Sequence, residues 1–436
     1  MKVLAAEKII GIETFFVPFE GIGGKLRSRS EDFIVREVSK YPPGKEPGRF
    51  SIADVTAINW ETNLLVRELS DRLNISRQRI NFAGTKDKRA MTTRLMSFFN
   101  VPKEKLSEVR INNVKIENIY CSDFPVKIGD HHGNKFEIKI RNVDRKIKKD
   151  NIAEIESSVE QYGGFPNFYG IQRFGVVRPI THVVGRFIVK NDFENAVWSY
   201  IANPMAGENE ETYRLRENLQ KTRDISAALK SYTNELVFEK AILNKLINEP
   251  KNYVGALKEL PRNLLTMFIY AYQSRLFNRI LSERIRKKIP LNEAIVGDII
   301  LPLRKSVFDE NGILVKESNI QKVNKQISKK KAAVSGILFG SGTVFSEGEM
   351  GEIEHKIIDK EKIDSRDFII PDMPNLSSSG SRRSLLAFVK DLDFKLGKDE
   401  LNKGKNVLNL KFELQKGCYA TSLLREFMKT DDIKNY

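Results

Sequence analysis

Residues 80–93 read INFAGTKDKRAMTT, a short apolar run followed by a turn that carries four charged side chains. The run at 80–84 is typical of a strand, and in the turn after it Asp87 lies between Lys86 and Lys88. Flanking cations stabilise negative charge on a carboxylate, and small residues leave room for a substrate to approach the backbone. An ionised carboxylate can attack an electrophilic carbon. Asp87 is therefore a candidate nucleophile, and a solvated turn is the alternative interpretation.

The segments on either side of this turn alternate between the periodicities of strands and helices. At 134–141 three apolar residues, Phe136, Ile138 and Ile140, point to one side, and the charged residues between them, up to Arg141, point to the other. Strands are predicted at 31–38, 80–84, 134–141 and 410–415, and helices at 61–74, 151–162, 260–286 and 421–428. Because strands and helices are mixed without βαβ regularity, the predicted fold class is α+β.

The charge of the chain favours a phosphate-bearing partner. Its 436 residues include 73 Lys and Arg against 57 Asp and Glu, which gives a net charge of +16 and a pI near 9.5. Such an excess attracts nucleic acid, although a merely basic soluble protein has the same composition. The two cysteines, Cys121 and Cys418, do not form a disulfide framework, so a cytoplasmic location is expected. We expect no membrane association, because no apolar run reaches the roughly 20 residues of a membrane span.

Other kinds of catalytic site have little support. The four histidines lack the spacing of metal ligands, and there is no G-x-S-x-G motif, so neither a metal nor a cofactor is expected. The run at 377–383, SSSGSRR, offers hydroxyls, backbone amides and two guanidinium groups to a phosphate. A flexible solvated connection explains that run equally well.

Aromatic residues stand close to basic ones at several points. Phe33 lies near Arg27, and Phe136 follows Lys135. Unpaired bases are usually gripped by aromatic stacking together with cations along the backbone. Each of these aromatic residues could instead belong to the hydrophobic core.

Six motifs in this order resemble the tRNA pseudouridine synthase D (TruD) family. They are the basic residue Arg27, EDFIVRE at 31–37, AGTKDKRAMTT at 83–93, GNKFEIKIRNV at 133–143, PNFYGIQRFG at 166–175 and GCYATSLLRE at 417–426. The chain departs from the family pattern at three points. Arg27 stands where the family has lysine, Phe168 and Tyr169 reverse the usual aromatic order, and Tyr419 stands where phenylalanine is common.

The resemblance implies a catalytic domain with a mixed, mainly antiparallel sheet and an inserted, RNA-contacting α/β (TRUD) domain. On this basis residues 1–160 and 376–436 are expected to form the catalytic domain, and residues 161–375 the insertion. The resemblance also implies site residues. Asp87 would be the nucleophile, and the substrate-binding residues would be Phe33, Asn134, Phe136, Tyr419, Arg27, Lys86 and Arg89.

The implied reaction isomerises uridine to pseudouridine in RNA, most often uridine 13 of tRNA, without a cofactor, a metal or an obligate protein partner. The target base would be flipped into a pocket. The sequence does not decide whether Asp87 attacks ribose C1′ or the uracil ring. Two alternatives are a catalytically silent RNA-binding protein on the same fold and a metal-dependent nuclease.

Overall fold

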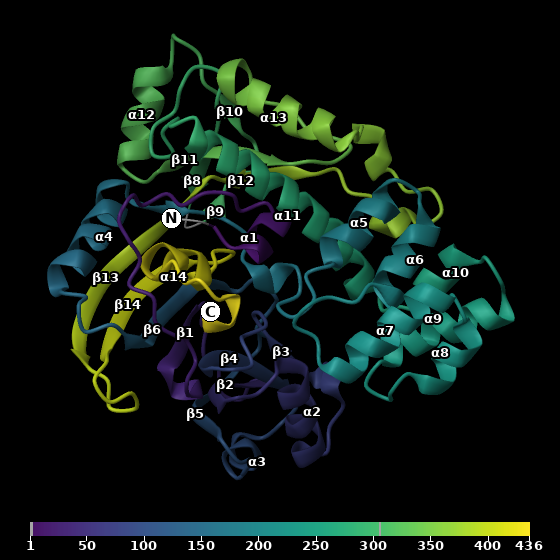
Figure 1. Cartoon of the computed structure of the whole chain (residues 1–436). Coiled ribbons are helices and arrows are strands. Elements are labelled where there is room, and N and C mark those ends of the chain that lie inside the picture. The colour runs from purple at the N-terminus through teal and green to yellow at the C-terminus, as the bar shows by residue number, and fades with distance from the viewer. Residues whose placement is uncertain (1–2, 305–306) are drawn as a thin grey trace. The chain divides into compact units, whose positions relative to one another are not determined.

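The computed structural model describes residues 3–304 and 307–436, and the chain folds into two compact units (Figure 1). Unit 1 comprises Met1–Phe16 and Pro166–Leu386, and unit 2 comprises Val17–Phe165 and Ala387–Tyr436. The expected division placed the N-terminus with the catalytic domain, whereas the segment up to Phe16 is grouped with the middle of the chain.

Hydrogen bonds explain why the N-terminal segment belongs to unit 1. Backbone carbonyls at the end of α1 (Ala5–Ile9) and just after it accept hydrogen bonds from side chains of α11 (Arg262–Arg286). The donors are Arg275 to Ile9 (3.1 Å), Asn278 to Ile10 (3.0 Å) and Ser282 to Gly11 (3.0 Å). Because Ile10 is fully buried, this segment is part of the core of unit 1.

Unit 2 is built on a mixed sheet. Its described strands are β1 (Phe33–Ser39), β2 (Phe50–Ile58), β3 (Ile80–Phe82), β4 (Met91–Phe99), β5 (Val114–Ser122), β6 (His131–Val143), β7 (Gly164–Pro166), β13 (Leu386–Lys398) and β14 (Asn406–Gln415). Their order is β5-β2-β4-β1-β6-β14-β13-β7, with β3 paired to β4. β1 and β4 run parallel, whereas β1–β6, β2–β4, β2–β5, β6–β14 and β13–β14 are antiparallel.

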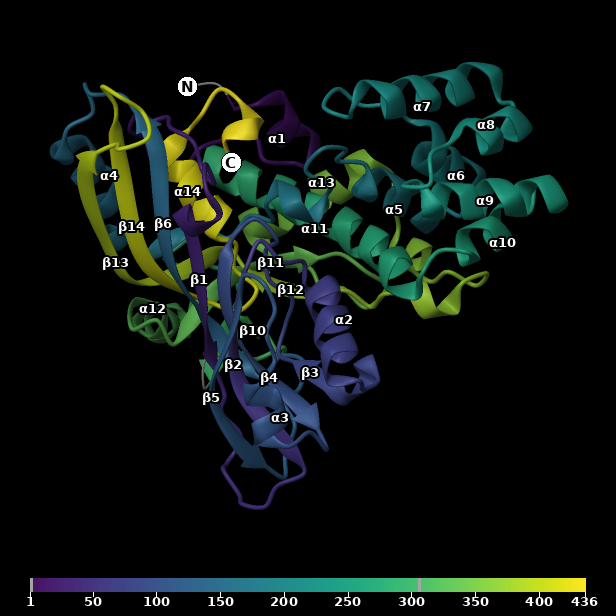
Figure 2. The same ribbon diagram turned by 90° about the horizontal axis from the view of Figure 1, so that it is seen from below.

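Five of these strands, β2, β4, β5, β7 and β13, had no sequence prediction. For β2 and β4 the reason is that both of their faces are covered. On one face of β4, Met96 and Phe98 pack with Leu65 and Leu69 of α2 (Thr62–Leu73), which lies beside β3 and β4 in Figure 2. On the other face Leu95 packs in a second buried cluster. A strand that is buried on both sides has no polar alternation by which to recognise it.

All eight predicted segments form the expected kind of element, and the α+β class is confirmed. α2 stands where the helix at 61–74 was predicted, and α4 (Lys149–Gln161) and α14 (Ala420–Met428) account for two other predicted helices. α4 ends before Gly163, whose φ of 74° is the left-handed conformation that favours glycine at a helix C-terminus. Among the described residues of unit 2, the one remaining α-helix is the short α3 (Lys103–Ser107).

Arg141 corrects one detail of the predicted strand at 134–141. The alternation placed Arg141 on the solvent side, but its side chain is 2% exposed. It donates two hydrogen bonds to Asp32 (2.8 and 2.7 Å), one to Asp399 (2.9 Å) and one to Glu400 (2.9 Å). The hydrogen bonds that Arg141 donates to Asp32 come first among the effects that raise the pKa of Arg141. A guanidinium at a strand position that was predicted to face solvent can therefore be buried when carboxylates surround it.

Unit 1 contains a smaller sheet and most of the helices. The sheet has the described strands β8 (Ile299–Arg304), β9 (Val307–Phe308), β10 (Ile313–Leu314), β11 (Ala332–Leu338) and β12 (Ser381–Ser384), in the order β10-β8-β11-β12 with β9 on β8. The helices are α5 (Thr181–Val189), α6 (Phe193–Ala202), α7 (Glu210–Thr222), α8 (Ile225–Ser231), α9 (Val237–Asn248), α10 (Tyr253–Lys258), α11, α12 (Ile320–Ser328) and α13 (Gly348–Glu361).

Within unit 1, α11 is the central helix. It packs against α5, α13 and β11, while α6 to α10 gather in a helical cluster (Figures 1 and 2). Fourteen of its 25 residues are buried, including Phe268 and Phe277. Within residues 3–304 and 307–436, no helix is long and apolar enough to cross a bilayer.

Replacement of Arg141 by Met tests the buried network. Asp32 and Asp399 would lose their cation in a buried site, and breaking such a pair costs about 3–5 kcal/mol. The matched control is Arg36→Met on β1, because Arg36 forms an exposed pair with Glu137, which contributes about 0–1 kcal/mol. Urea unfolding of both variants measures the free energies. Equal losses in the two variants would contradict a special role for Arg141.

Candidate active site

Parallel pairing of β1 with β4 places the chain segments that precede the two strands at one edge of the sheet. Ile34 pairs with Met91, so both strands begin at the same level. The segment 25–32 leads into β1, and the turn 83–90 leads into β4. The sheet topology therefore brings Arg27 close to Asp87, although 60 positions separate them in the sequence.

The Arg27 and Asp87 side chains form an ion pair of unequal burial. Arg27 Nη2 lies 3.7 Å from Asp87 Oδ2, and the exposed fractions of the two side chains are 10% and 46%. At this distance the charges attract each other, but the contact is longer than a hydrogen bond. Burial lowers the pKa of Arg27, and the Asp87 charge opposes that effect. Asp87 therefore has a fixed cation beside it and an accessible carboxylate.

Several contacts hold Arg27 in place. Its guanidinium carbon lies 4.0 Å from the centre of the Phe33 ring, within the range of a cation–π interaction. Its φ of 53° is in the left-handed region, which is unusual for arginine and costs about 1–2 kcal/mol. Arg89 donates a hydrogen bond of 3.4 Å to the Arg27 carbonyl. Residues with strained backbones often occur at functional sites, where the surrounding contacts fix them.

The Arg141 network anchors this segment on both sides of Arg27. Before it, the backbones of Lys25 and Arg141 exchange hydrogen bonds of 2.8 and 2.9 Å. After it, Asp32 accepts a hydrogen bond of 2.9 Å from the Arg29 amide while it binds the Arg141 guanidinium. Arg141 thus affects the site by fixing the backbone on both sides of Arg27.

Lys86, the neighbour of Asp87, is turned into the protein. Lys86 Nζ lies 2.6 Å from Glu37 Oε2, and the two side chains are only 5% and 0% exposed. Burial lowers the pKa of Lys86, whereas the Glu37 charge opposes the shift. Lys86 was expected to be a substrate-binding residue, but in the structure its ammonium group forms a buried ion pair with Glu37.

A shared hydroxyl fixes the backbone at the same point. Thr62, at the start of α2, accepts hydrogen bonds from the Lys86 amide (3.1 Å) and from Arg94 Nη1 (2.7 Å). Burial lowers the pKa of Arg94 to about 10, so that it stays a cation at neutral pH. The turn that carries Asp87 is therefore attached to α2 and β4, and Asp87 is presented from a supported backbone.

The aromatic residues form a packed group. Phe33 meets the edge of Phe136 with ring centres 6.3 Å apart, and Phe136 stacks on Phe412 at 5.1 Å. Their exposed fractions are 1%, 6% and 3% for Phe33, Phe136 and Phe412. Phe136 was expected to stack on a base, and in the structure one of its faces is already covered by Phe412. Phe412 itself was predicted only as part of a strand.

Asn134 lies on the same face of β6 as Phe136, two residues earlier, and pairs across the sheet with Glu37. Its Oδ1 is buried, and no described residue donates a hydrogen bond to it.

His131 Nδ1 is also without a partner among residues 3–304 and 307–436, and its pKa is lowered first by burial and then by Lys86. Tyr419 is half-buried at the N-cap of α14, and its role stays a prediction.

Three comparisons with known proteins agree on one family. The model of "tRNA pseudouridine synthase D (TruD)" matches residues 9–427. Probable tRNA pseudouridine synthases D from Methanococcoides burtonii and Archaeoglobus fulgidus are 40% and 36% identical, over 98% of this chain each and 98% and 99% of their own. A crystal structure of the putative enzyme from Methanosarcina mazei covers 100% of both chains with a TM-score of 0.89 and 38% identity.

The chain belongs to the tRNA pseudouridine synthase D family. It is accordingly an isomerase of the pseudouridine synthase class, and its substrate is an RNA. As a member of this family, it carries the six motifs described above. Contacts in the structure join five residues of these motifs, namely Arg27, Phe33, Asp87, Arg89 and Phe136.

Glu37, Thr62 and Arg94 hold the turn that carries Asp87, and none of the three was predicted as a site residue from the sequence. For Glu37 a signal existed, because residues 33, 35 and 37 of a strand share one face and the first two are buried apolar residues. A carboxylate on that face needs a buried cation. Nothing in the sequence pairs Thr62 with Arg94, since only the folded sheet brings α2 next to β4.

A comparison of two lysines distinguishes a structural Lys86 from a ligand-binding one. Lys86→Met leaves Glu37 buried without its cation, and we expect a loss of about 3–5 kcal/mol in the free energy of unfolding. Lys88→Met is the control, because Lys88 is exposed two residues away and surface changes stay within about 0.5 kcal/mol. Urea unfolding measures both. Unchanged stability of Lys86→Met would show that the buried pair is not needed.

Proposed function

We propose that this enzyme converts uridine to pseudouridine in tRNA, at uridine 13, with Asp87 as the nucleophile. The observation that carries the proposal is the ion pair of a half-exposed Asp87 with the buried, ring-stacked Arg27. The tRNA substrate is supported by the names of the relatives and by the net charge of +16. Position 13 rests on the resemblance to the family.

The reaction needs a nucleophile that is negatively charged and whose lone pairs remain available to the substrate. The N1–C1′ bond breaks, a C5–C1′ bond forms, and the proton of C5 leaves while N1 gains one. Asp87 attacks either ribose C1′ or the uracil ring, and departs again when the new bond has formed. A cation at 3.7 Å attracts the Asp87 carboxylate and still leaves its oxygen lone pairs available to the substrate.

The base must leave its stack to reach Asp87. In our proposal the group of Phe33, Phe136 and Phe412 is the rigid apolar floor of the base pocket, and Tyr419 is one of its walls. A floor of packed rings excludes water from the detached uracil. This role agrees with the burial of the three rings better than stacking of the base on a fully exposed Phe136 would.

Two polar residues would complete the recognition. An unsatisfied buried acceptor is unfavourable, and the N3–H of uracil can supply the missing hydrogen bond to Asn134 Oδ1. Arg89 is exposed beside Arg27 and carries a guanidinium suited to a phosphate of the flipped nucleotide. Because Lys86 is occupied by Glu37, we assign it to the support of the turn instead of to phosphate binding.

Asp87→Asn removes the negative charge and keeps the shape of the side chain. We expect turnover to fall by more than about 10⁴-fold, the range for loss of a nucleophile or its partner. The affinity for tRNA should change less than twofold, since one half-exposed carboxylate contributes little to docking. Tritium release from C5-labelled uridine in tRNA measures turnover, and Asp71→Asn on the exposed side of α2 is the control. Retained activity of Asp87→Asn would refute the assignment. Binding by the wild type without tritium release would indicate a silent RNA-binding protein.

Substitutions of Arg27 separate its charge from its geometry. Arg27→Met removes the cation beside Asp87, and we expect kcat to fall by about 10²–10³-fold, as when one electrostatic contact of a reaction centre is lost. Arg27→Lys keeps a cation and should stay within about tenfold of the wild type, because lysine is the residue of the family at this position. Single-turnover rates with saturating enzyme measure both. Equal losses for Met and Lys would show that the charge is not what Arg27 contributes.

A further inference from the structure

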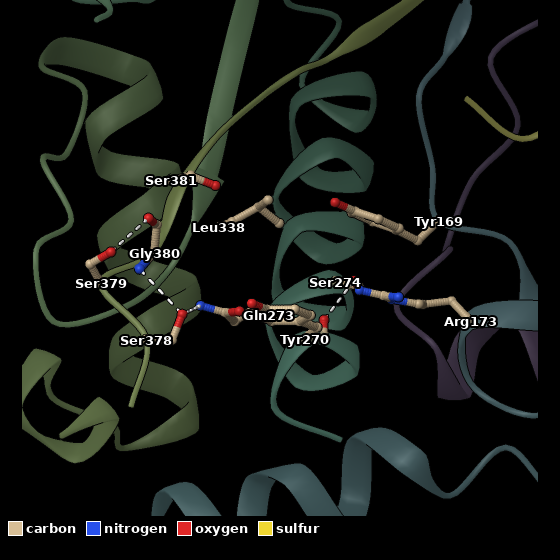
Figure 3. Close-up of a pocket in the computed structure, with 10 residues that line it drawn as sticks. All are labelled: Tyr169, Arg173, Tyr270, Gln273, Ser274, Leu338, Ser378, Ser379, Gly380 and Ser381. Carbon is tan, nitrogen blue, oxygen red and sulfur yellow. Dashed lines mark hydrogen bonds between the residues drawn. The ribbon is translucent and has the colours of Figure 1, made fainter. Parts of the chain in front are cut away.

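Unit 1 contains a hollow of about 290 Å³ that lies far along the chain from Asp87. Figure 3 shows its lining, which comes from the 166–175 motif, from α11, from the end of β11 and from the serine-rich segment that leads into β12. The lining residues are Tyr169, Arg173, Tyr270, Gln273, Ser274, Leu338 and Ser378 to Ser381. A volume near the lower end of ligand pockets, about 300–1,000 Å³, suits one base-sized group.

One wall of the hollow combines a cation with two aromatic rings. The guanidinium carbon of Arg173 lies 5.8 Å from the ring centre of Tyr169 and 5.7 Å from that of Tyr270. Arg173 Nε is buried and donates to no acceptor among residues 3–304 and 307–436. Tyr270 is 46% exposed, which is unusual for a large aromatic residue on a core helix. A buried donor without a partner and an exposed ring beside it point to a ligand.

A second arginine, Arg383, holds the Tyr169 ring in place. The guanidinium carbon of Arg383 lies 4.1 Å from the Tyr169 ring centre, and Arg383 also donates hydrogen bonds to the carbonyl oxygen (3.2 Å) and to Oδ1 (2.5 Å) of Asn167. Figure 3 shows Tyr169 and Arg173 both directed from their segment toward α11. This wall is therefore built before any ligand arrives.

The opposite wall is the serine-rich segment, which is a structured turn and not a flexible connection. Backbone amides of Ser341 and Gly342 donate to the carbonyls of Ser378 and Ser379, both at 2.9 Å. Gln273 Nε2 on α11 donates to Ser378 Oγ at 3.0 Å. Gly380 has a φ of 79°, and a Cβ there would lie 2.5 Å from the Leu338 carbonyl oxygen.

Of the three arginines nearby, Arg382 is already engaged with Glu354 (3.0 Å), and its side chain is 9% exposed. Arg383 is engaged with Asn167. The two guanidinium groups of the run 377–383 are thus engaged with other residues of unit 1, and Arg173 supplies the cation that faces the hollow.

We propose that this hollow binds one unpaired nucleotide of the substrate RNA other than the uridine that is isomerised. Its base stacks on Tyr270, its phosphate meets Arg173, and its ribose meets the hydroxyls of Ser379 and Ser381. Stacking on an exposed ring beside a cation is how unpaired nucleotides are held. The inference rests on the proposed function for the identity of the RNA, whereas the hollow itself lies wholly in unit 1.

The first experiment measures equilibrium binding of an unmodified tRNA transcript to the full chain at one fixed salt concentration. Loss of one stacked base weakens binding by about 5–150-fold, so Tyr270→Ala and Arg173→Met should each lose about tenfold. Tyr270→Phe keeps the ring and should stay within twofold. The control is Arg366→Met, an exposed arginine of unit 1 that pairs with the nearby Asp364. Thermal unfolding confirms that the variants are folded.

The second experiment identifies the nucleotide. Single abasic residues are placed in turn at the unpaired positions of the transcript, and binding to the wild type and to Tyr270→Ala is compared. We expect one position at which the missing base weakens wild-type binding about tenfold but leaves Tyr270→Ala unaffected. Independent losses at every position would overturn the inference, as would wild-type affinity of Tyr270→Ala. If the wild type releases no tritium from uridine, the proposed function fails instead, and the two failures are therefore distinguishable.

Discussion

Parallel pairing of β1 with β4 is the constraint on which the active site depends. Antiparallel neighbours would place the start of one strand beside the end of the other, so Arg27 and Asp87 would lie at opposite edges of the sheet. With both strands starting at the same level, the two preceding segments meet. The proximity of Arg27 and Asp87 is therefore set by backbone hydrogen bonds, and the side chains only complete the ion pair.

Buried charge then makes the site rigid. Below the turn, Lys86 and Glu37 pair at 2.6 Å, and beside it Arg141 binds Asp32 and Asp399. Desolvation makes such groups expensive, so they persist only with well-placed partners. The same requirement fixes the backbone on both sides of Arg27 and at Lys86. A hydrophobic core of similar volume could give equal stability without specifying where the carboxylate of Asp87 stands.

The sequence could predict the elements with a clear period and the residues that carry family motifs. The alternation at 134–141 predicted β6, and the motif at 83–93 indicated Asp87. It could not predict β4, because a strand covered on both faces has no alternation. It also placed Arg141 in solvent, since charge alone does not reveal that three carboxylates from distant segments converge on it. Pairings of this kind exist only in the folded sheet.

The proposed reaction requires a uridine turned out of its stack beside Asp87, and a structure of the Asp87→Asn variant bound to unmodified tRNA is the direct test. We expect a flipped uridine whose reacting carbon, ribose C1′ or a uracil ring carbon, lies about 3–3.5 Å from the side chain at position 87. The uracil should rest against the rings of Phe33 and Phe136. A target uridine that is still stacked in the RNA, or bound away from position 87, would contradict the proposed reaction.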